Sequence, residues 1–152
     1  MVAKQNIQGL YAPDGATYVT ITDGGGNLTG LGTAGLPSGA TPLTGVFSGA
    51  DTASAAATLT VTAGKTGYIT GFSVSGLGAT GATTVIVAIT GPTNTLSYSY
   101  VFVAGATLPN TPILFNFNTP IPASAVSTNI VVTVPGSAGN TATQINVWGF
   151  QV

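Results

Sequence analysis

Apolar and polar residues alternate in short runs over most of the chain, from about residue 46 to the C-terminus. The clearest runs cover residues 57–62, 96–102, 113–117, 130–134 and 145–150. A period of two is typical of β-strands, because successive side chains of a strand point to opposite faces. No window has the 3.6-residue period of an amphipathic helix. The pattern therefore predicts an all-β fold.

Two further runs flank a glycine-rich segment at residues 76–81, so residues 67–91 are predicted to form a β-hairpin with a six-residue loop. In the first run we expect four alternate side chains to share one face: Tyr68, Thr70, Phe72 and Val74. The second run, residues 83–90, is apolar on both faces, which is typical of a strand in the middle of a sandwich.

These runs amount to seven strands, and residues 44–48 are a possible eighth. Gly, Pro and Asn residues separate the runs at short and regular intervals. About eight antiparallel strands in two sheets suit a jelly-roll-like β-sandwich. We expect this domain to span residues 46–152.

Residues 1–45 have a different composition and are expected to form an extended N-terminal arm. One short strand is predicted at residues 18–22, and the stretch from residue 24 to residue 45 has too many glycines for a long strand. A segment of this kind gains order by lying on a partner. The expected contact residues are the spaced large side chains of the arm: Ile7, Leu10, Tyr11, Tyr18, Leu28, Leu31 and Leu36.

Charged residues make up only 3% of the chain, against about 25% in ordinary proteins. The complete set is Lys4, Lys65, Asp14, Asp23 and Asp51. This composition excludes the basic surface that nucleic-acid binding requires and a polybasic helix for membrane surfaces. The N-terminus lacks the apolar core of a signal peptide, and no run approaches the roughly 20 apolar residues of a membrane span. We therefore expect neither nucleic acid nor a membrane as a partner.

The chain contains no His, Cys, Glu or Arg, so we expect no enzymatic activity, no metal and no cofactor. A Ser or Thr nucleophile would lack a histidine base. A metal site built from Asp14, Asp23, Asp51 and backbone carbonyls is the weaker alternative.

Two glycine motifs resemble nucleotide-binding sequences without the required context. The spacing of Gly76, Gly78 and Gly81 matches a dinucleotide fingerprint, but a strand follows it in place of a helix, and no acidic residue lies beyond it. The segment from Gly64 to Thr66 has Leu59 where a phosphate-binding loop requires glycine. We interpret both segments as turns.

Aromatic residues suggest a further alternative, the binding of sugars. Tyr98, Tyr100, Trp148 and Phe150 occupy alternate strand positions, however, and this favours core packing over an exposed platform. Sugar binding is therefore the less favoured interpretation of these residues.

Two stretches resemble proteins of tailed bacteriophages. Residues 7–23 resemble the start of small virion proteins, and residues 120–135 with 146–150 resemble the jelly-roll part of capsid decoration (cement) proteins. The resemblance implies a homotrimer on the outer capsid surface of the virion, seated at three-fold positions, where it stabilises the major capsid protein against internal pressure. It implies no catalytic residue.

The residues themselves also favour an oligomer, because residues 85–89 and 130–134 are apolar on both faces and offer more apolar surface than one core requires. Two alternatives remain for the function. One is a structural component of a phage tail, neck or fibre. The other is a carbohydrate-binding or adhesin module with a β-sandwich fold.

Overall fold

A computed structural model of the 152-residue chain describes residues 36–37, 39–49, 54–105, 111–136 and 142–152. The strand predicted at residues 18–22 lies outside these ranges. The chain divides into two units after Ser38, and the second unit, Gly39–Val152, contains the sandwich. Its first strand starts at Thr41, before the boundary that the sequence suggested at residue 45.

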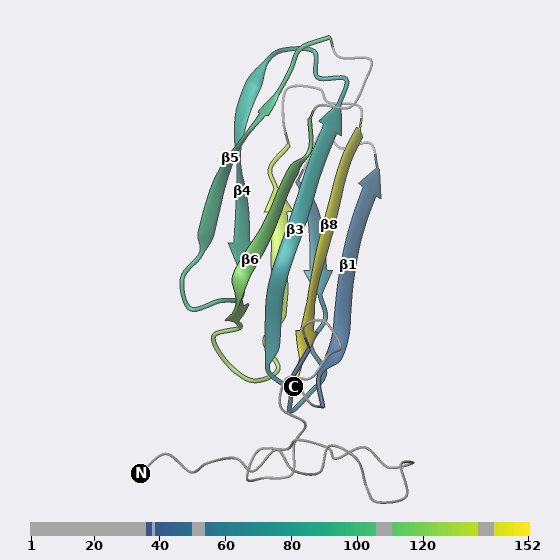
Figure 1. Ribbon diagram of the computed structural model, residues 1–152. Coiled ribbons are helices and arrows are strands. Elements are labelled where there is room, and N and C mark those ends of the chain that lie inside the picture. Colours follow the sequence, from purple (N-terminus) through teal and green to yellow (C-terminus); the bar gives the residue numbers. More distant parts are fainter. Residues whose placement is uncertain (1–35, 38, 50–53, 106–110, 137–141) are drawn as a thin grey trace, which may run out of the picture. The chain divides into compact units, whose positions relative to one another are not determined.

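The described residues form eight strands and no helix, which confirms the predicted all-β sandwich (Figure 1). The strands are β1 (Thr41–Gly49), β2 (Ala55–Leu59), β3 (Gly67–Leu77), β4 (Thr83–Thr90), β5 (Leu96–Phe102), β6 (Ile113–Pro122), β7 (Ile130–Val134) and β8 (Ala142–Gln151). They build two four-stranded sheets, a front sheet in the order β1-β8-β3-β6 and a back sheet in the order β2-β7-β4-β5. All neighbouring strands in these sheets are antiparallel. Eight strands wound between two sheets in this way form a jelly roll.

The predicted hairpin over residues 67–91 is wrong, because its two strands lie in different sheets. β3 pairs with β6 and β8 in the front sheet, and β4 pairs with β5 and β7 in the back sheet. The glycine-rich connection between them crosses from one sheet to the other, with Gly78 at a φ of 76°. A loop rich in glycine serves either purpose, so the sequence pattern did not distinguish a turn within a sheet from a crossing between sheets.

A β-bulge in β3 changes which side chains face the core. The pairing of β3 with both neighbours shifts between Ile69 and Gly71. One extra residue reverses the alternation that follows it. Ile69, Phe72 and Val74 are consequently fully buried, whereas Tyr68 is only half-buried and lies on the other side of the sheet. The expectation that Tyr68, Thr70, Phe72 and Val74 share one face is therefore wrong.

The core lies between the sheets and is filled by alternate residues of both. Its largest fully buried side chains are Phe72, Phe102, Leu59, Ile69, Ile89, Ile130 and Ile145. Each contributes about 1.5–3 kcal/mol through removal of apolar surface from water. In β4 the core positions are Val85, Val87 and Ile89, as the alternation predicted.

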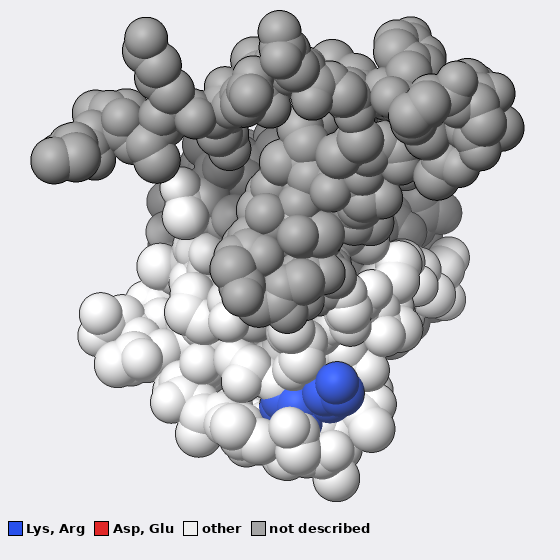
Figure 2. Space-filling model, turned by 60° about the horizontal axis from the view of Figure 1, so that its bottom comes forward, with Lys and Arg blue, Asp and Glu red and all other residues white. Residues whose placement is uncertain are grey.

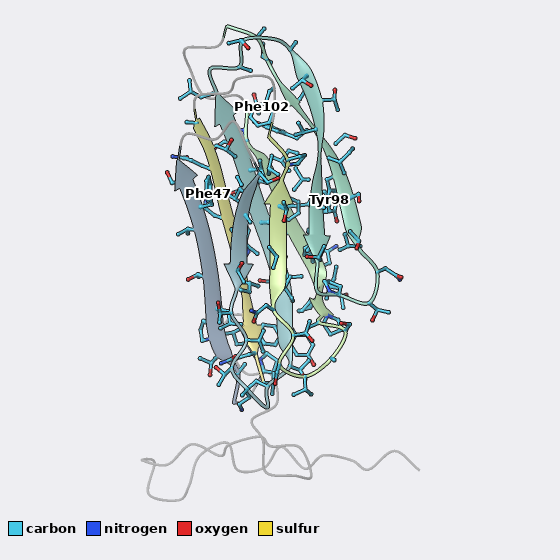
Figure 3. The ribbon with its side chains drawn as sticks, turned by 180° about the vertical axis from the view of Figure 1, so that it is seen from behind. Phe47, Tyr98 and Phe102 are labelled. Atoms are coloured by element: carbon cyan, nitrogen blue, oxygen red, sulfur yellow. The ribbon has the colours of Figure 1, made fainter. Side chains whose placement is uncertain are left out.

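The two long sides of the sandwich are closed by different means. On the side of β1 and β2 the backbones come so close that a Cβ on Gly45 would overlap the carbonyl oxygen of Thr58. On the side of β5 and β6 aromatic rings fill the gap, and the rings of Tyr98 and Phe115 have centroids 4.6 Å apart. Figure 3 shows Phe47 and Tyr98 on these two opposite sides.

Candidate binding surfaces

The outer face of the front sheet presents a broad uncharged surface, which we call the outer front face. Its side chains alternate with those of the core and come from all four strands of the sheet. They are Pro42, Thr44, Val46, Ser48, Tyr68, Ser73, Ser75, Leu114, Asn116, Pro122, Gln144, Asn146, Trp148 and Phe150.

Trp148 lies on this face and not in the core, so the expectation of core packing is wrong for this residue. Its neighbours along β8, Ile145 and Val147, take the core positions. The half-buried indole lies over Gly71, and a Cβ added there would be 2.6 Å from its Cζ2 atom. Only glycine leaves room for the ring at this point. The hydroxyl of Thr70, in the bulge, donates a 3.2 Å hydrogen bond to the carbonyl oxygen of Trp148.

An apolar row crosses the front sheet beside Trp148, formed by Pro42, Phe150, Tyr68 and Pro122 in adjacent strands. The rings of Tyr68 and Phe150 are stacked, with centroids 4.9 Å apart and planes inclined by 12°. Phe150 is only 3% exposed, yet it does not belong to the cluster that fills the space between the sheets. Phe150 is thus buried, as expected, but in this row of the front sheet and not in the cluster between the sheets. We call Pro42, Phe150, Tyr68 and Pro122 the apolar row.

On the other side of Trp148 most side chains of the outer front face are polar, and Val46 and Leu114 are its exposed apolar residues. Asn146 Nδ2 donates a 3.2 Å hydrogen bond to the hydroxyl of Ser73 on the neighbouring strand. Asn116 stands opposite Gly71, and Gln144 stands opposite Ser75. Amides and hydroxyls both donate and accept hydrogen bonds, so this part of the face can match a ligand with the same mixed character.

A second surface is the side of the sandwich between β5 and β6. Phe72, Tyr98, Phe115 and Phe117 form a cluster of rings with centroids 4.6–6.3 Å apart. Tyr98 and Tyr100 thus lie on the core face of β5, as expected. Phe115 is nevertheless 39% exposed, so the cluster also reaches the surface. Loss of solvent raises the pKa of Tyr98 above its usual value.

A third surface is the outer face of the back sheet, where small side chains surround two exposed apolar residues. Ile86 of β4 is 48% exposed and Val101 of β5 is 52% exposed. Ala88 and Ser97 face each other across the same two strands. We call this surface the outer back face.

Lys65 is the only charged residue among those described, and Figure 2 shows it as an isolated basic position. It is exposed in the connection between β2 and β3, where its N–H donates to the carbonyl oxygen of Thr62 at 3.1 Å. Gly64 precedes it with a φ of 81°. This geometry is a tight turn, as the sequence suggested, and no helix follows it.

Of the expected contact residues, only Leu36 belongs to the described part of the chain, where it is 43% exposed. The others, Ile7, Leu10, Tyr11, Tyr18, Leu28 and Leu31, lie outside it. The three aspartates also lie outside it, and the residues that are described contain no group of three potential metal ligands.

No family model, curated protein or solved structure matches this chain. Within the described ranges no helix is long and apolar enough to cross a membrane.

Proposed function

We propose that the chain is a structural virion protein that decorates the outer surface of a phage capsid and stabilises it by bridging major capsid subunits. The jelly-roll strand order supports this proposal, because viral capsid proteins are among the proteins that use this architecture. The resemblance of residues 7–23 and 120–135 to phage virion proteins points the same way.

The observation that carries the proposal is the exposure of apolar side chains without ionic cover. Val46 is 72% exposed on β1, Leu114 is 65% exposed on β6, and Val101 is 52% exposed on β5. A soluble surface ordinarily has about 25–35% charged residues, whereas the described part of this chain has Lys65 alone. Exposed apolar positions on several sides are expected of a subunit that contacts several neighbours.

The same observation supports a homotrimer, with the outer back face around Ile86 and Val101 as the contact between copies. Closed symmetry covers such a surface on every copy at once. Native mass spectrometry at micromolar concentration tests this part. A trimeric mass is expected, and a monomeric mass contradicts it.

The decisive experiment adds the purified protein to expanded, undecorated heads and measures cosedimentation. Cryo-EM should then show it on the outer capsid in many copies, and protein-loaded heads should resist heat better than bare heads. A handful of copies confined to a tail, neck or fibre would favour that alternative instead.

A truncated chain that starts at Gly39 tests the expected role of the arm. We expect it to fold, because every residue of the buried core cluster lies between Ala55 and Val147. Circular dichroism provides the control for folding. The truncated protein should decorate heads poorly, and unchanged affinity would move the capsid contact from the arm to the sandwich.

A further inference from the structure

We infer that the outer front face around Trp148 is a binding site for an uncharged oligosaccharide. This inference goes beyond the decoration function and does not depend on it. It concerns a surface that the isolated protein already presents.

The outer front face carries a fixed aromatic platform. The indole of Trp148 lies over Gly71. The Thr70 hydroxyl donates a 3.2 Å hydrogen bond to the Trp148 carbonyl oxygen, and this bond fixes the local backbone. Tyr68 stands beside it, stacked on Phe150 at 4.9 Å. Both Trp148 and Tyr68 remain half-buried, so part of each ring is accessible. The C–H groups of a pyranose ring pack on accessible aromatic rings, and rings that are already positioned lose little entropy on binding.

Polar side chains surround this platform. Asn146 is exposed and its amide is oriented by the 3.2 Å bond to Ser73. Thr44 is exposed on β1, opposite Trp148, and Asn116 is exposed on β6, where it lies opposite Gly71. Sugar hydroxyls both donate and accept hydrogen bonds, and side-chain amides and hydroxyls have the same mixed capacity. Aromatic surface with a few placed polar groups is the usual composition of a small-ligand site.

The lack of charged side chains on the described part of this face indicates that the sugar is uncharged. In the described part of the chain the only ion is Lys65, in the turn between β2 and β3 and not on the outer front face. An anionic glycan would lose its hydration on this face without gaining a cationic partner, and burial of an unpaired charge is costly. An uncharged oligosaccharide avoids this cost.

A second copy of the chain fits this face less well. The cores of lasting subunit interfaces are enriched in apolar residues. The middle of the outer front face consists of Ser73, Ser75, Asn146 and Gln144, and the exposed apolar residues Val46 and Leu114 lie to either side of it, on β1 and β6. A subunit contact on this face would bury these polar groups at its centre, whereas sugar hydroxyls can pair with them.

The test uses the fluorescence of Trp148, which is the only tryptophan in the chain. The full-length protein is titrated with maltohexaose, cellohexaose, chitohexaose and mannohexaose up to about 10 mM, a range that covers dissociation constants near 1 mM. At least one neutral probe should shift the Trp148 emission saturably and protect it from acrylamide quenching. Hexagalacturonate, the charged comparison, should bind at least about tenfold more weakly.

Substitutions on the two outer faces distinguish sugar binding at the outer front face from a nonspecific effect of the sugar on the protein. Asn146→Ala and Asn116→Ala change exposed polar positions, and each should weaken binding about three- to tenfold through loss of a hydrogen bond. Trp148→Ala, followed by calorimetry, should abolish binding. Val101→Thr on the outer back face is the matched control and should leave the affinity unchanged.

Three results would overturn the inference. The first is the absence of any response of Trp148 to all four neutral probes. The second is an equal effect of Val101→Thr and Asn146→Ala on the affinity. The third is a Trp148 emission that shifts with protein concentration as oligomers form, since this would show that another copy covers the outer front face.

Discussion

Truncation of Phe72 to alanine is expected to destabilise the sandwich strongly, because this ring links the two sheets on the side of β5 and β6. Phe72 is 0% exposed, and its centroid lies 5.2 Å from that of Tyr98, 5.9 Å from that of Phe115 and 6.3 Å from that of Phe117. Its removal takes away one buried ring and the contacts of that ring with three others.

The magnitude follows from burial. Complete burial of a phenylalanine side chain contributes about 1.5–3 kcal/mol, and the cavity left by truncation raises the cost of Phe72→Ala to about 3–5 kcal/mol. Phe115→Ala is the matched control in the same cluster. Phe115 is already 39% exposed, so water can enter the space that its ring leaves. We expect this control to cost about 1–2 kcal/mol.

Urea unfolding, followed by Trp148 emission at a fixed protein concentration, measures both changes. The concentration is held constant because association of subunits adds to the apparent stability. The reasoning fails if Phe72→Ala costs less than about 1.5 kcal/mol, or if the two variants cost the same. Equal costs would mean that a partner, and not Phe72, closes this side of the sandwich.

Three further substitutions test other parts of the fold. Gln151→Ala removes the side chain that accepts from the Thr62 N–H at 2.8 Å and donates to the Thr62 hydroxyl at 2.9 Å, and it should lower the free energy of unfolding by about 1–3 kcal/mol in urea. Gly76→Ala should cost about 1–3 kcal/mol because its Cβ would overlap the Phe102 ring, and an unchanged melting temperature would contradict this packing. Burial raises the pKa of Tyr98 in the folded state, so unfolded chains lose this proton first as the pH rises. The neutral Tyr98 side chain should therefore stabilise the folded state fully below about pH 10, and this contribution should be lost as the pH rises further. In Tyr98→Phe the urea midpoint should fall less steeply at alkaline pH.

The strands themselves could be predicted from the sequence because their alternation is strong. In β4 and β7 the residues that alternate in the sequence also alternate between core and surface, as in the series Ile130, Val132 and Val134. The possible strand at residues 44–48 exists as the middle of β1. Side-chain alternation is a property of each strand alone, so no knowledge of its neighbours was required.

The pairing of the strands could not be predicted in the same way. β3 and β4 follow each other in the sequence but belong to different sheets. Their order depends on which faces meet across the core, and many arrangements satisfy the same alternation. Of the contact residues expected in the arm, all but Leu36 lie outside the described residues, so their role stays a prediction.

The candidate site on the outer front face depends on a single residue of β3. Without the bulge, regular alternation would place Tyr68 on the same side as Phe72, in the core, and no aromatic residue of β3 would stand beside Trp148. The extra residue at Thr70 turns Tyr68 outward against Phe150, and it brings Gly71 opposite Trp148, where the missing Cβ makes room for the indole. A glycine inside a strand is itself a signal for a bulge or a close approach, and Gly71 was visible in the sequence. Considered together with the Trp148 that it faces, this glycine would have indicated an aromatic surface outside the core.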